Sequence, residues 1–301
     1  MGETLAGRVA IVTGAGRGLG ASVARLFAAE GAKVVVNDFG VAVDGSSPDD
    51  TPAAEVVKVI QADGGEAVAN AADVGDFAAA EALVQQAVDE FGRLDILVNV
   101  AGILRDRMIF NMAEEEWDDV IRVHLKGTFN TCRHASAYFR TQKDTGGHFR
   151  IINFTSGAGL HGGPTQPNYS AAKLGIVGLT YSCANALGRY GVTANAISPA
   201  ASTRMTSTIP EGGLGIEDNG DPFMSPDNVA PAVAYLASER SDWCTGQVIA
   251  VYGKKIVLFK RFDLEAVVAS PTPWDIATAT ELMEEVIQPA TVGPYDPYRQ
   301  A

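Results

Sequence analysis

A tyrosine and a lysine placed four residues apart have the clearest chemical potential in this sequence of 301 residues. Tyr169 and Lys173 would lie on one face of a helix, about one turn from each other. A nearby ammonium favours the phenolate and draws the pKa of a phenol down from about 10 toward the working range. Ser156, thirteen residues before Tyr169, would hold a carbonyl or alcohol oxygen beside the phenol, unless it only caps a strand end. These residues predict a site that moves a proton while another group moves a hydride.

The glycines near the N-terminus indicate a carrier for that hydride. The apolar run at 8–13 is typical of a buried strand, and residues 21–30 have helical periodicity up to Gly31. The turn between them has the spacing T-G-x-x-x-G-x-G, which brings backbone N–H groups and the positive end of a helix to a pyrophosphate. We therefore predict a dinucleotide site rather than an ordinary tight turn. It is formed by Gly14, Gly16, Arg17, Gly18, Leu19 and Gly20.

An acidic residue after the second expected strand bears on the choice of cofactor. The strand at 33–36 leads into Asp38, 24 positions after Gly14. A carboxylate there suits a ribose with free hydroxyls and would repel a 2′-phosphate, which favours NAD over NADP. Arg17 argues the other way, because a basic residue in the glycine turn suits that phosphate. The alternative is that Asp38 is only a surface turn residue.

Strand and helix patterns alternate along the chain. This alternation predicts an α/β fold with a single Rossmann-like, doubly wound parallel sheet flanked by helices. Expected strands are 66–69, 94–98, 149–155, 192–197 and 247–252, and expected helices are 53–63, 77–91, 117–140 and 168–190.

Two segments stand apart from this alternation. Residues 200–226 are rich in Gly, Pro, Ser and Thr and are typical of a substrate lid. We expect one cofactor-binding and catalytic domain over 1–260. Residues 261–301 would be a C-terminal extension, too short for a domain, which either covers a neighbouring subunit's site or pads the fold's edge.

Composition excludes several classes of protein. The net charge of −13, without a Lys/Arg-rich stripe, argues against nucleic-acid binding and adhesion to anionic membranes. The scattered Cys132, Cys183 and Cys244 have no C-x-x-C spacing, so we expect reduced thiols and no metal site. Neither a signal segment nor a membrane-spanning run is evident, and we expect a cytoplasmic protein.

Over roughly residues 5–255 the chain resembles the short-chain dehydrogenase/reductase family. The matching pieces are 13–20, Asp73-Val74, 99–102, Ser156, Tyr169-x-x-x-Lys173 and Pro199. The resemblance implies a nicotinamide cofactor, Tyr169 as acid/base, Ser156 as holder of the substrate oxygen, and Lys173 on the nicotinamide ribose. It also implies a cofactor lying against Asp73, Val74, Asn99, Ala101, Gly102, Pro199 and Thr203.

The chain departs from the family pattern at two positions. His124 stands where the family usually has an asparagine that helps to hold a water beside the lysine. It is either a member of that relay or a hydrogen-bonded core histidine. Ala200 follows Pro199 where glycine is more common, which would slightly reshape the nicotinamide pocket.

A narrower resemblance points to a substrate class. Segments 101–107, 122–127, 169–175 and 202–206 look like the (3R)-hydroxyacyl-CoA dehydrogenase part of peroxisomal multifunctional enzyme type 2. This branch implies oxidation of the 3-hydroxyl of an acyl-CoA thioester. The alternatives are a free steroid, polyol or other small alcohol, and a catalytically silent cofactor-binding protein.

Coenzyme A is polyanionic, so an acidic protein needs local positive charge to hold it. Candidates, each otherwise a solvated surface charge, are Arg105, Arg107, Arg204 and Lys254-Lys255. Apolar lid residues that would cover an acyl or steroid body are Met205, Leu214, Ile216 and Met224. His161 is a loop histidine that would touch substrate only if the loop folds inward. Family analogy implies a homodimer or homotetramer that pairs the long helices.

Overall fold

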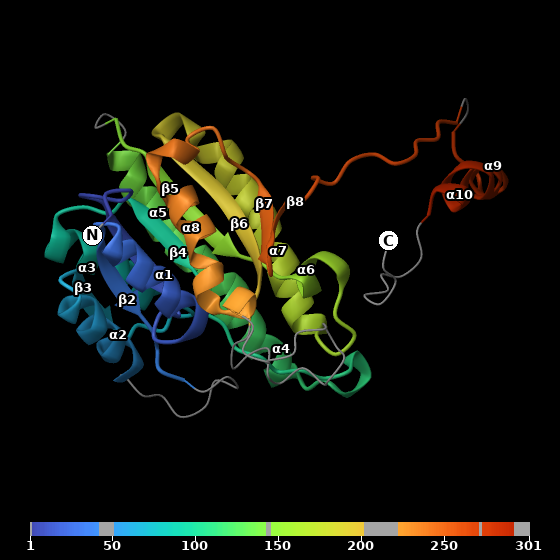
Figure 1. The fold of residues 1–301 in the computed structure, drawn as a ribbon. Coiled ribbons are helices and arrows are strands. Elements are labelled where there is room, and N and C mark those ends of the chain that lie inside the picture. Colours follow the sequence, from blue (N-terminus) through green and yellow to red (C-terminus); the bar gives the residue numbers. More distant parts are fainter. Residues whose placement is uncertain (1, 42–50, 143–145, 202–221, 271–272, 292–301) are drawn as a thin grey trace. The chain divides into compact units, whose positions relative to one another are not determined.

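The structure of this protein is a computed structural model, and its fold is built on one eight-stranded sheet (Figure 1). The structure describes residues 2–41, 51–142, 146–201, 222–270 and 273–291. The strand order is β3-β2-β1-β4-β5-β6-β7-β8, with β7 and β8 antiparallel and the other neighbours parallel. The prediction of a doubly wound parallel sheet is therefore confirmed.

The strands are short and largely buried. Their bounds are β1 (Val9–Thr13), β2 (Lys33–Asn37), β3 (Glu66–Asn70), β4 (Ile96–Asn99), β5 (Phe149–Phe154), β6 (Val192–Ala200), β7 (Val248–Tyr252) and β8 (Lys255–Leu258). Apolar residues fill the central strands, as expected of a parallel sheet covered on both faces. All carboxyl ends of the parallel strands meet at one edge of the sheet, where ligands bind in such folds.

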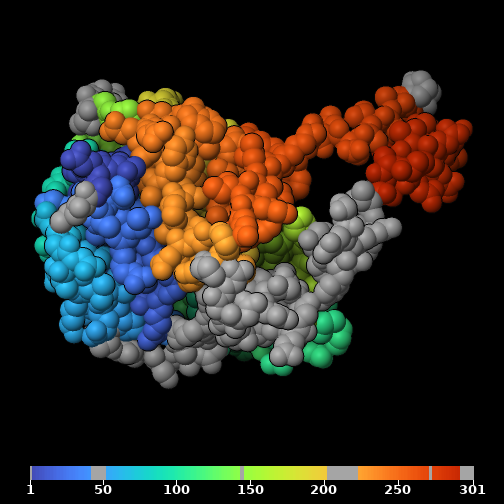
Figure 2. All heavy atoms as spheres, viewed as in Figure 1, coloured from blue at the N-terminus to red at the C-terminus, as the bar shows by residue number. Residues whose placement is uncertain are grey.

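Helices cover both faces of the sheet. They are α1 (Gly18–Ala29), α2 (Thr51–Ala62), α3 (Phe77–Phe91), α4 (Glu114–Val120), α5 (Gly127–Thr141), α6 (Gly157–His161), α7 (Pro167–Leu187) and α8 (Ala230–Ala237). Helices α1, α2 and α8 share one core with the sheet, and α3, α5 and α7 share the other. In the space-filling view the blue α1 and orange α8 regions meet on the first of these faces (Figure 2).

Several element boundaries differ from the sequence prediction, and one strand was not predicted. The helix predicted at 117–140 begins at Glu114 and contains a π-helical turn, Ile121–Lys126, between α4 and α5. β4 begins at Ile96 rather than 94, and the carboxylate of the preceding Asp95 accepts a hydrogen bond from the Val9 amide at 2.9 Å. The strand β8 was not predicted; its Ile256 and Leu258 are exposed at the sheet edge and give no buried pattern.

The chain divides into two compact units, Met1–Phe259 and Lys260–Ala301. The second unit contains α9 (Ile276–Leu282), a π-helical turn, Met283–Ile287, and α10 (Gln288–Ala290). None of its described side chains is buried. Most of the predicted lid lies outside the described residues, including Met205, Leu214 and Ile216. Among the described residues, we find no helix with the length and apolarity that crossing a membrane requires.

Candidate active site

The glycine turn between β1 and α1 packs too tightly for side chains. Gly14 has a φ of +61°, and a Cβ on it would lie 2.7 Å from the Cα of Ala101. A Cβ on Gly20 would lie 2.2 Å from the carbonyl oxygen of Gly14. The first turn of α1 carries no cap from the side chain of Arg17, its N-cap residue. The turn therefore offers backbone N–H groups and a helix N-terminus to an anion at the edge of the sheet.

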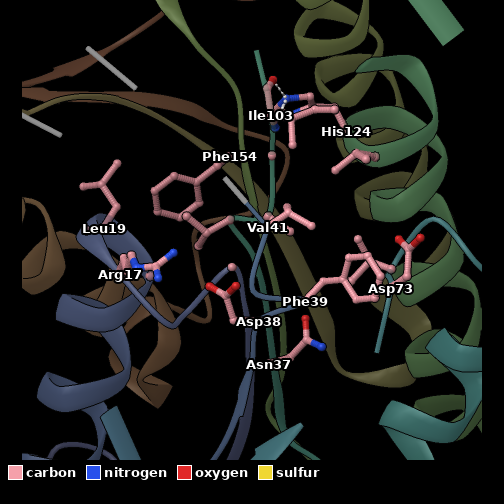
Figure 3. Close-up of a pocket in the computed structure, with 18 of the residues that line it drawn as sticks. Arg17, Leu19, Asn37, Asp38, Phe39, Val41, Asp73, Ile103, His124 and Phe154 are labelled. Carbon is pink, nitrogen blue, oxygen red and sulfur yellow. Dashed lines mark hydrogen bonds between the residues drawn. The ribbon is translucent and has the colours of Figure 1, made fainter. Parts of the chain in front are cut away.

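Asp38 is fixed in the pocket that opens beside this turn (Figure 3). One carboxylate oxygen accepts the amide of Gly16 and the other accepts the amide of Gly40, both at 2.8 Å. Arg17 also lines the pocket. A negative charge is thus held at the carboxyl end of β2, where a ribose of a dinucleotide would reach it.

The far side of the pocket is formed by the segment after β3 and by the π-helical turn. Asp73 accepts a hydrogen bond from Arg122 at 2.6 Å and one from the Gly75 amide at 2.8 Å. Val74 is buried and lines the pocket together with Phe39. The sequence alone indicated no role for Arg122 or Phe39. Their only distinguishing feature there is that Phe39 directly follows Asp38 and Arg122 lies two residues before His124.

Ala101, Gly102 and Pro199 line the pocket as the sequence predicted. Asn99 turns to the buried side instead. Its amide donates to Asn153 at 2.9 Å, and its oxygen accepts from Thr131 at 2.7 Å. A contact between Asn99 and an adenosine ribose therefore stays a prediction, and Thr203 lies outside the described residues.

Tyr169 and Lys173 line this pocket, and Ser156 lies beside them through its hydrogen bond with Tyr169. Ser156 is the N-cap of α6, where its hydroxyl accepts the Ala158 amide at 3.2 Å, and it is hydrogen-bonded to the Tyr169 phenol. The Lys173 ammonium lies 5.5 Å from the centre of the Tyr169 ring and donates to the carbonyl oxygen of Phe154 at 2.7 Å. Because β5 and α7 are adjacent in space, Ser156, just after the end of β5, reaches the face of α7 that carries Tyr169.

The sequence-based expectation for the phenol pKa is wrong for this structure. Burial raises the pKa of Tyr169 to about 12, the bond with Ser156 lowers it, and the charge of Asp106 raises it further. Burial also lowers the pKa of Lys173 to about 7. A dry site disfavours every isolated charge, so a phenolate at Tyr169 depends on a positive charge held close to it.

His124 lies beside Tyr169, and its side chain is buried. Its Nε2 lies 2.8 Å from the carbonyl oxygen and 3.1 Å from the amide nitrogen of Ile103, and the tautomer decides which bond forms (Figure 3). Nδ1 has no hydrogen-bond partner among the described residues. Burial, followed by the charge of Lys173, lowers the pKa of His124 to about 3, so the imidazole is neutral. The histidine is thus hydrogen-bonded in the core and also lines the pocket.

Three of the candidate cations for a polyanionic substrate already have partners. Arg105 pairs with Asp119 at 3.2 Å, and Arg107 pairs with Glu116 at 3.0 Å. Lys254 lies 4.7 Å from the centre of the Phe223 ring, and Arg204 lies outside the described residues. His161 packs on Phe259, with 5.9 Å between the rings, and is not brought to Tyr169.

The residues of the pocket fit a nicotinamide dinucleotide. The cradle left by Gly14 and Gly20 suits a pyrophosphate, Asp38 suits ribose hydroxyls, and buried Val74 gives an apolar surface for a base. The cavity measures about 380 Å³ and reaches Tyr169 and Lys173. No cluster of three His, Cys, Asp or Glu side chains able to hold a metal occurs within the described ranges.

Comparison with known proteins agrees with this geometry. Residues 8–212 match the family profile described as short chain dehydrogenase. The chain is 44% identical to hydroxyacyl-CoA dehydrogenase ChsB1 of Mycobacterium tuberculosis over 93% of this chain and 89% of that protein. It is 44% identical to peroxisomal multifunctional enzyme type 2 of Drosophila melanogaster over 85% of this chain, but spans only 42% of that longer protein.

A crystal structure of a short chain dehydrogenase from Mycobacterium avium has the same fold. It aligns with a TM-score of 0.85 and 45% identity, and covers 99% of this chain and 100% of that chain.

Proposed function

Since this chain belongs to the short-chain dehydrogenase/reductase family, we propose that it is an NAD-dependent dehydrogenase of 3-hydroxyacyl-CoA thioesters. The chain is an oxidoreductase acting on CH–OH groups. The observation that carries the proposal is that Tyr169, hydrogen-bonded to Ser156, and Lys173 line the same pocket as Asp38. The thioester substrate is supported by the similarity to hydroxyacyl-CoA dehydrogenase ChsB1.

In the proposed reaction, Tyr169 accepts the proton of the substrate hydroxyl while the carbon loses a hydride. The cofactor supplies, when bound, a hydride acceptor with a positively charged ring. Ser156 donates a hydrogen bond to the substrate oxygen as it becomes a carbonyl. Lys173 holds an ammonium near the phenolate, and the low dielectric of the pocket strengthens this attraction. The reverse reaction returns the proton from Tyr169 to the alkoxide oxygen.

The preference for NAD rests on Asp38. Its carboxylate is hydrogen-bonded to two backbone amides, so it cannot turn away from a 2′-phosphate. Arg17 is the opposing charge in the same pocket, but its side chain is exposed and forms no hydrogen bond or ion pair within the described part of the chain. We therefore expect the fixed carboxylate of Asp38, rather than the Arg17 guanidinium on its flexible side chain, to determine the cofactor preference.

We also propose a cytoplasmic homodimer or homotetramer that pairs the long helices. Large apolar side chains are exposed along these helices, namely Trp117, Phe129 and Leu174. Their burial between copies would remove apolar surface from water. Light scattering of the purified protein tests the stoichiometry, and a monomer at micromolar concentration would contradict it.

The test of the function is cofactor reduction with (3R)- and (3S)-3-hydroxyacyl-CoA thioesters of several chain lengths, with NAD and NADP separately. We expect NAD-dependent turnover of one enantiomer. Tyr169→Phe should lower kcat by about 10²- to 10⁴-fold with cofactor affinity retained, because a general base is lost. Tyr181→Phe, on the same helix, is the matched control and should keep its activity. Full activity of Tyr169→Phe refutes the mechanism, and turnover of free alcohols alone refutes the thioester substrate.

A further inference from the structure

Asn168, the residue directly before Tyr169, has a fully buried side chain whose polar atoms all have partners. Its Nδ2 donates to the carbonyl oxygen of Arg105 at 3.1 Å and to that of Glu116 at 2.9 Å. Its Oδ1 accepts the backbone amide of Tyr169 at 2.7 Å. An asparagine amide has two N–H donors and one acceptor oxygen, so these three bonds use each group of the side chain.

These bonds join three separate parts of the site. Arg105 follows the pocket-lining segment after β4, Glu116 belongs to α4, and Tyr169 lies in the first turn of α7. The first amides of a helix have no partner within the helix. Asn168 therefore both completes the start of α7 and ties it to two neighbouring segments.

The segment between β4 and α4 is also joined to the residues directly before α7. The backbone amide of Arg107 donates to the carbonyl oxygen of Thr165 at 2.7 Å. The side-chain amide of Gln166 donates to both carboxylate oxygens of Asp106, at 2.9 and 3.1 Å. These bonds lie toward the surface, whereas those of Asn168 are shielded from water and lie next to the phenol.

We propose that Asn168 is a positioning residue that sets the placement of Tyr169 by fixing the start of α7 to the β4–α4 segment. This inference rests on the proposed role of Tyr169 as acid/base. An amide is required, because leucine, of similar shape, lacks both the donors and the acceptor that these three hydrogen bonds use. Aspartate keeps the acceptor for Tyr169 but turns an oxygen toward two carbonyl oxygens.

The cofactor cradle does not depend on these bonds. Its glycine turn lies between β1 and α1 and Asp38 directly follows β2, and within the described residues Asn168 forms no hydrogen bond with these parts. A displaced phenol should therefore lower kcat and leave the dissociation constant of the cofactor unchanged. Misplacement of a reacting group by about 1 Å costs on the order of 100-fold in rate.

The aspartate variant gives a readout that a purely structural role would not change. The groups facing the phenol are Ser156, Lys173, His124 and Asp106, from four different segments. None of these groups is altered in Asn168→Asp. A buried carboxylate between carbonyl oxygens has a raised pKa, and its protonated form regains one donated bond. Part of the lost kcat should therefore return as the pH is lowered, in the opposite direction to the oxidation rate of the wild type.

The experiment compares Asn168→Asp and Asn168→Leu with Asn195→Asp as the matched control. Asn195 is also buried, donates to the carbonyl oxygen of Cys244 at 2.8 Å and accepts the Gln247 amide at 3.0 Å, away from the pocket. We expect a fall in kcat of about 100-fold in both Asn168 variants, with the cofactor dissociation constant within twofold of wild type. The control should lose thermal stability but keep the kcat of its folded fraction.

Hydrogen exchange supplies a readout that needs no turnover. The Tyr169 amide should exchange faster in Asn168→Leu, while exchange in segment 14–20 stays as in wild type. Unchanged exchange at Tyr169, or a kcat that falls no further than in Asn195→Asp, overturns the inference. If Tyr169→Phe is inactive while both Asn168 variants are fully active, only this inference fails. If Tyr169→Phe is fully active, the proposed function fails first.

Discussion

Replacement of Asp38 by alanine tests how the pocket chooses between the two nicotinamide cofactors. The carboxylate is half-buried at the carboxyl end of β2, and both of its oxygens are held by backbone amides at 2.8 Å. Removal of the carboxylate should weaken the binding of NAD, because the ribose hydroxyls lose a charged acceptor. It should also relieve the repulsion of the 2′-phosphate of NADP. The expected result is a reversal, or near reversal, of cofactor preference.

The magnitude follows from two free-energy contributions. A hydrogen bond to a charged acceptor contributes about 1.5–3 kcal/mol. Repulsion between two unit charges at about 4 Å amounts to about 1 kcal/mol in water and about 4 kcal/mol at an effective dielectric of about 20. Because Asp38 is partly solvated, the lower ends apply, and they sum to about 2.5 kcal/mol. At about 1.4 kcal/mol per decade, the ratio of kcat/KM for NADP to that for NAD should rise about 60-fold.

The assay measures kcat/KM for both cofactors with one saturating alcohol substrate. Asp38→Ala also frees the amides of Gly16 and Gly40, but any loosening of the turn affects both cofactors and cancels in the ratio. Asp73→Asn is the matched control, since it removes the negative charge paired with Arg122 in the same pocket and should leave the ratio unchanged. A wild-type protein that prefers NADP, or a shift under threefold in Asp38→Ala, refutes the reasoning.

Two other perturbations probe the surroundings of His124. In Gly102→Ala the added Cβ would lie 2.1 Å from Cε1 of the buried imidazole, so unfolding free energy should fall by about 1–3 kcal/mol; a melting temperature equal to wild type contradicts this. The folded pKa of His124 is about 3, below its ordinary value of 6.5, so its contribution to stability is complete above pH 6.5 and is lost as the pH falls toward 3. That difference is worth about 5 kcal/mol, and His124→Asn should flatten the loss of stability in urea unfolding between pH 7 and pH 4; an equal slope in both proteins contradicts it.

Local patterns in the sequence predicted most of what positions the site. The run at 8–13, the glycine turn and the helix after it were placed correctly, because each has its own signature of apolar residues and glycines. Ser156 and Tyr169 meet as expected because strand ends gather at one edge of a parallel sheet. These predictions needed only local geometry and the connection rules of the fold.

Features that depend on distant neighbours were not predicted. The direction of the Asn99 side chain is decided by Asn153 and Thr131, which come from β5 and α5. The π-helical turn at Ile121–Lys126 interrupts a helix whose periodicity reads as continuous. Nothing in the sequence distinguishes Asn168, and its hydrogen bonds to the carbonyl oxygens of Arg105 and Glu116 become evident only in the structure. Such contacts are properties of packing, which residue spacing does not encode.

The pKa values of Tyr169 and Lys173 bear on when the base is formed. Burial pushes both groups toward their neutral forms, to pKa values of about 12 and about 7. Neither charge is stable alone in the dry pocket, yet a phenolate and an ammonium 5.5 Å from the ring centre stabilise each other, as would a positive ring beside them. The phenolate should therefore be scarce in the free protein and should form only when positive charge accumulates in the pocket. Burial raises the pKa of the base in the free protein, but the same low dielectric strengthens its attraction to Lys173 and to a positively charged cofactor ring. Formation of the phenolate should therefore depend on a bound cofactor.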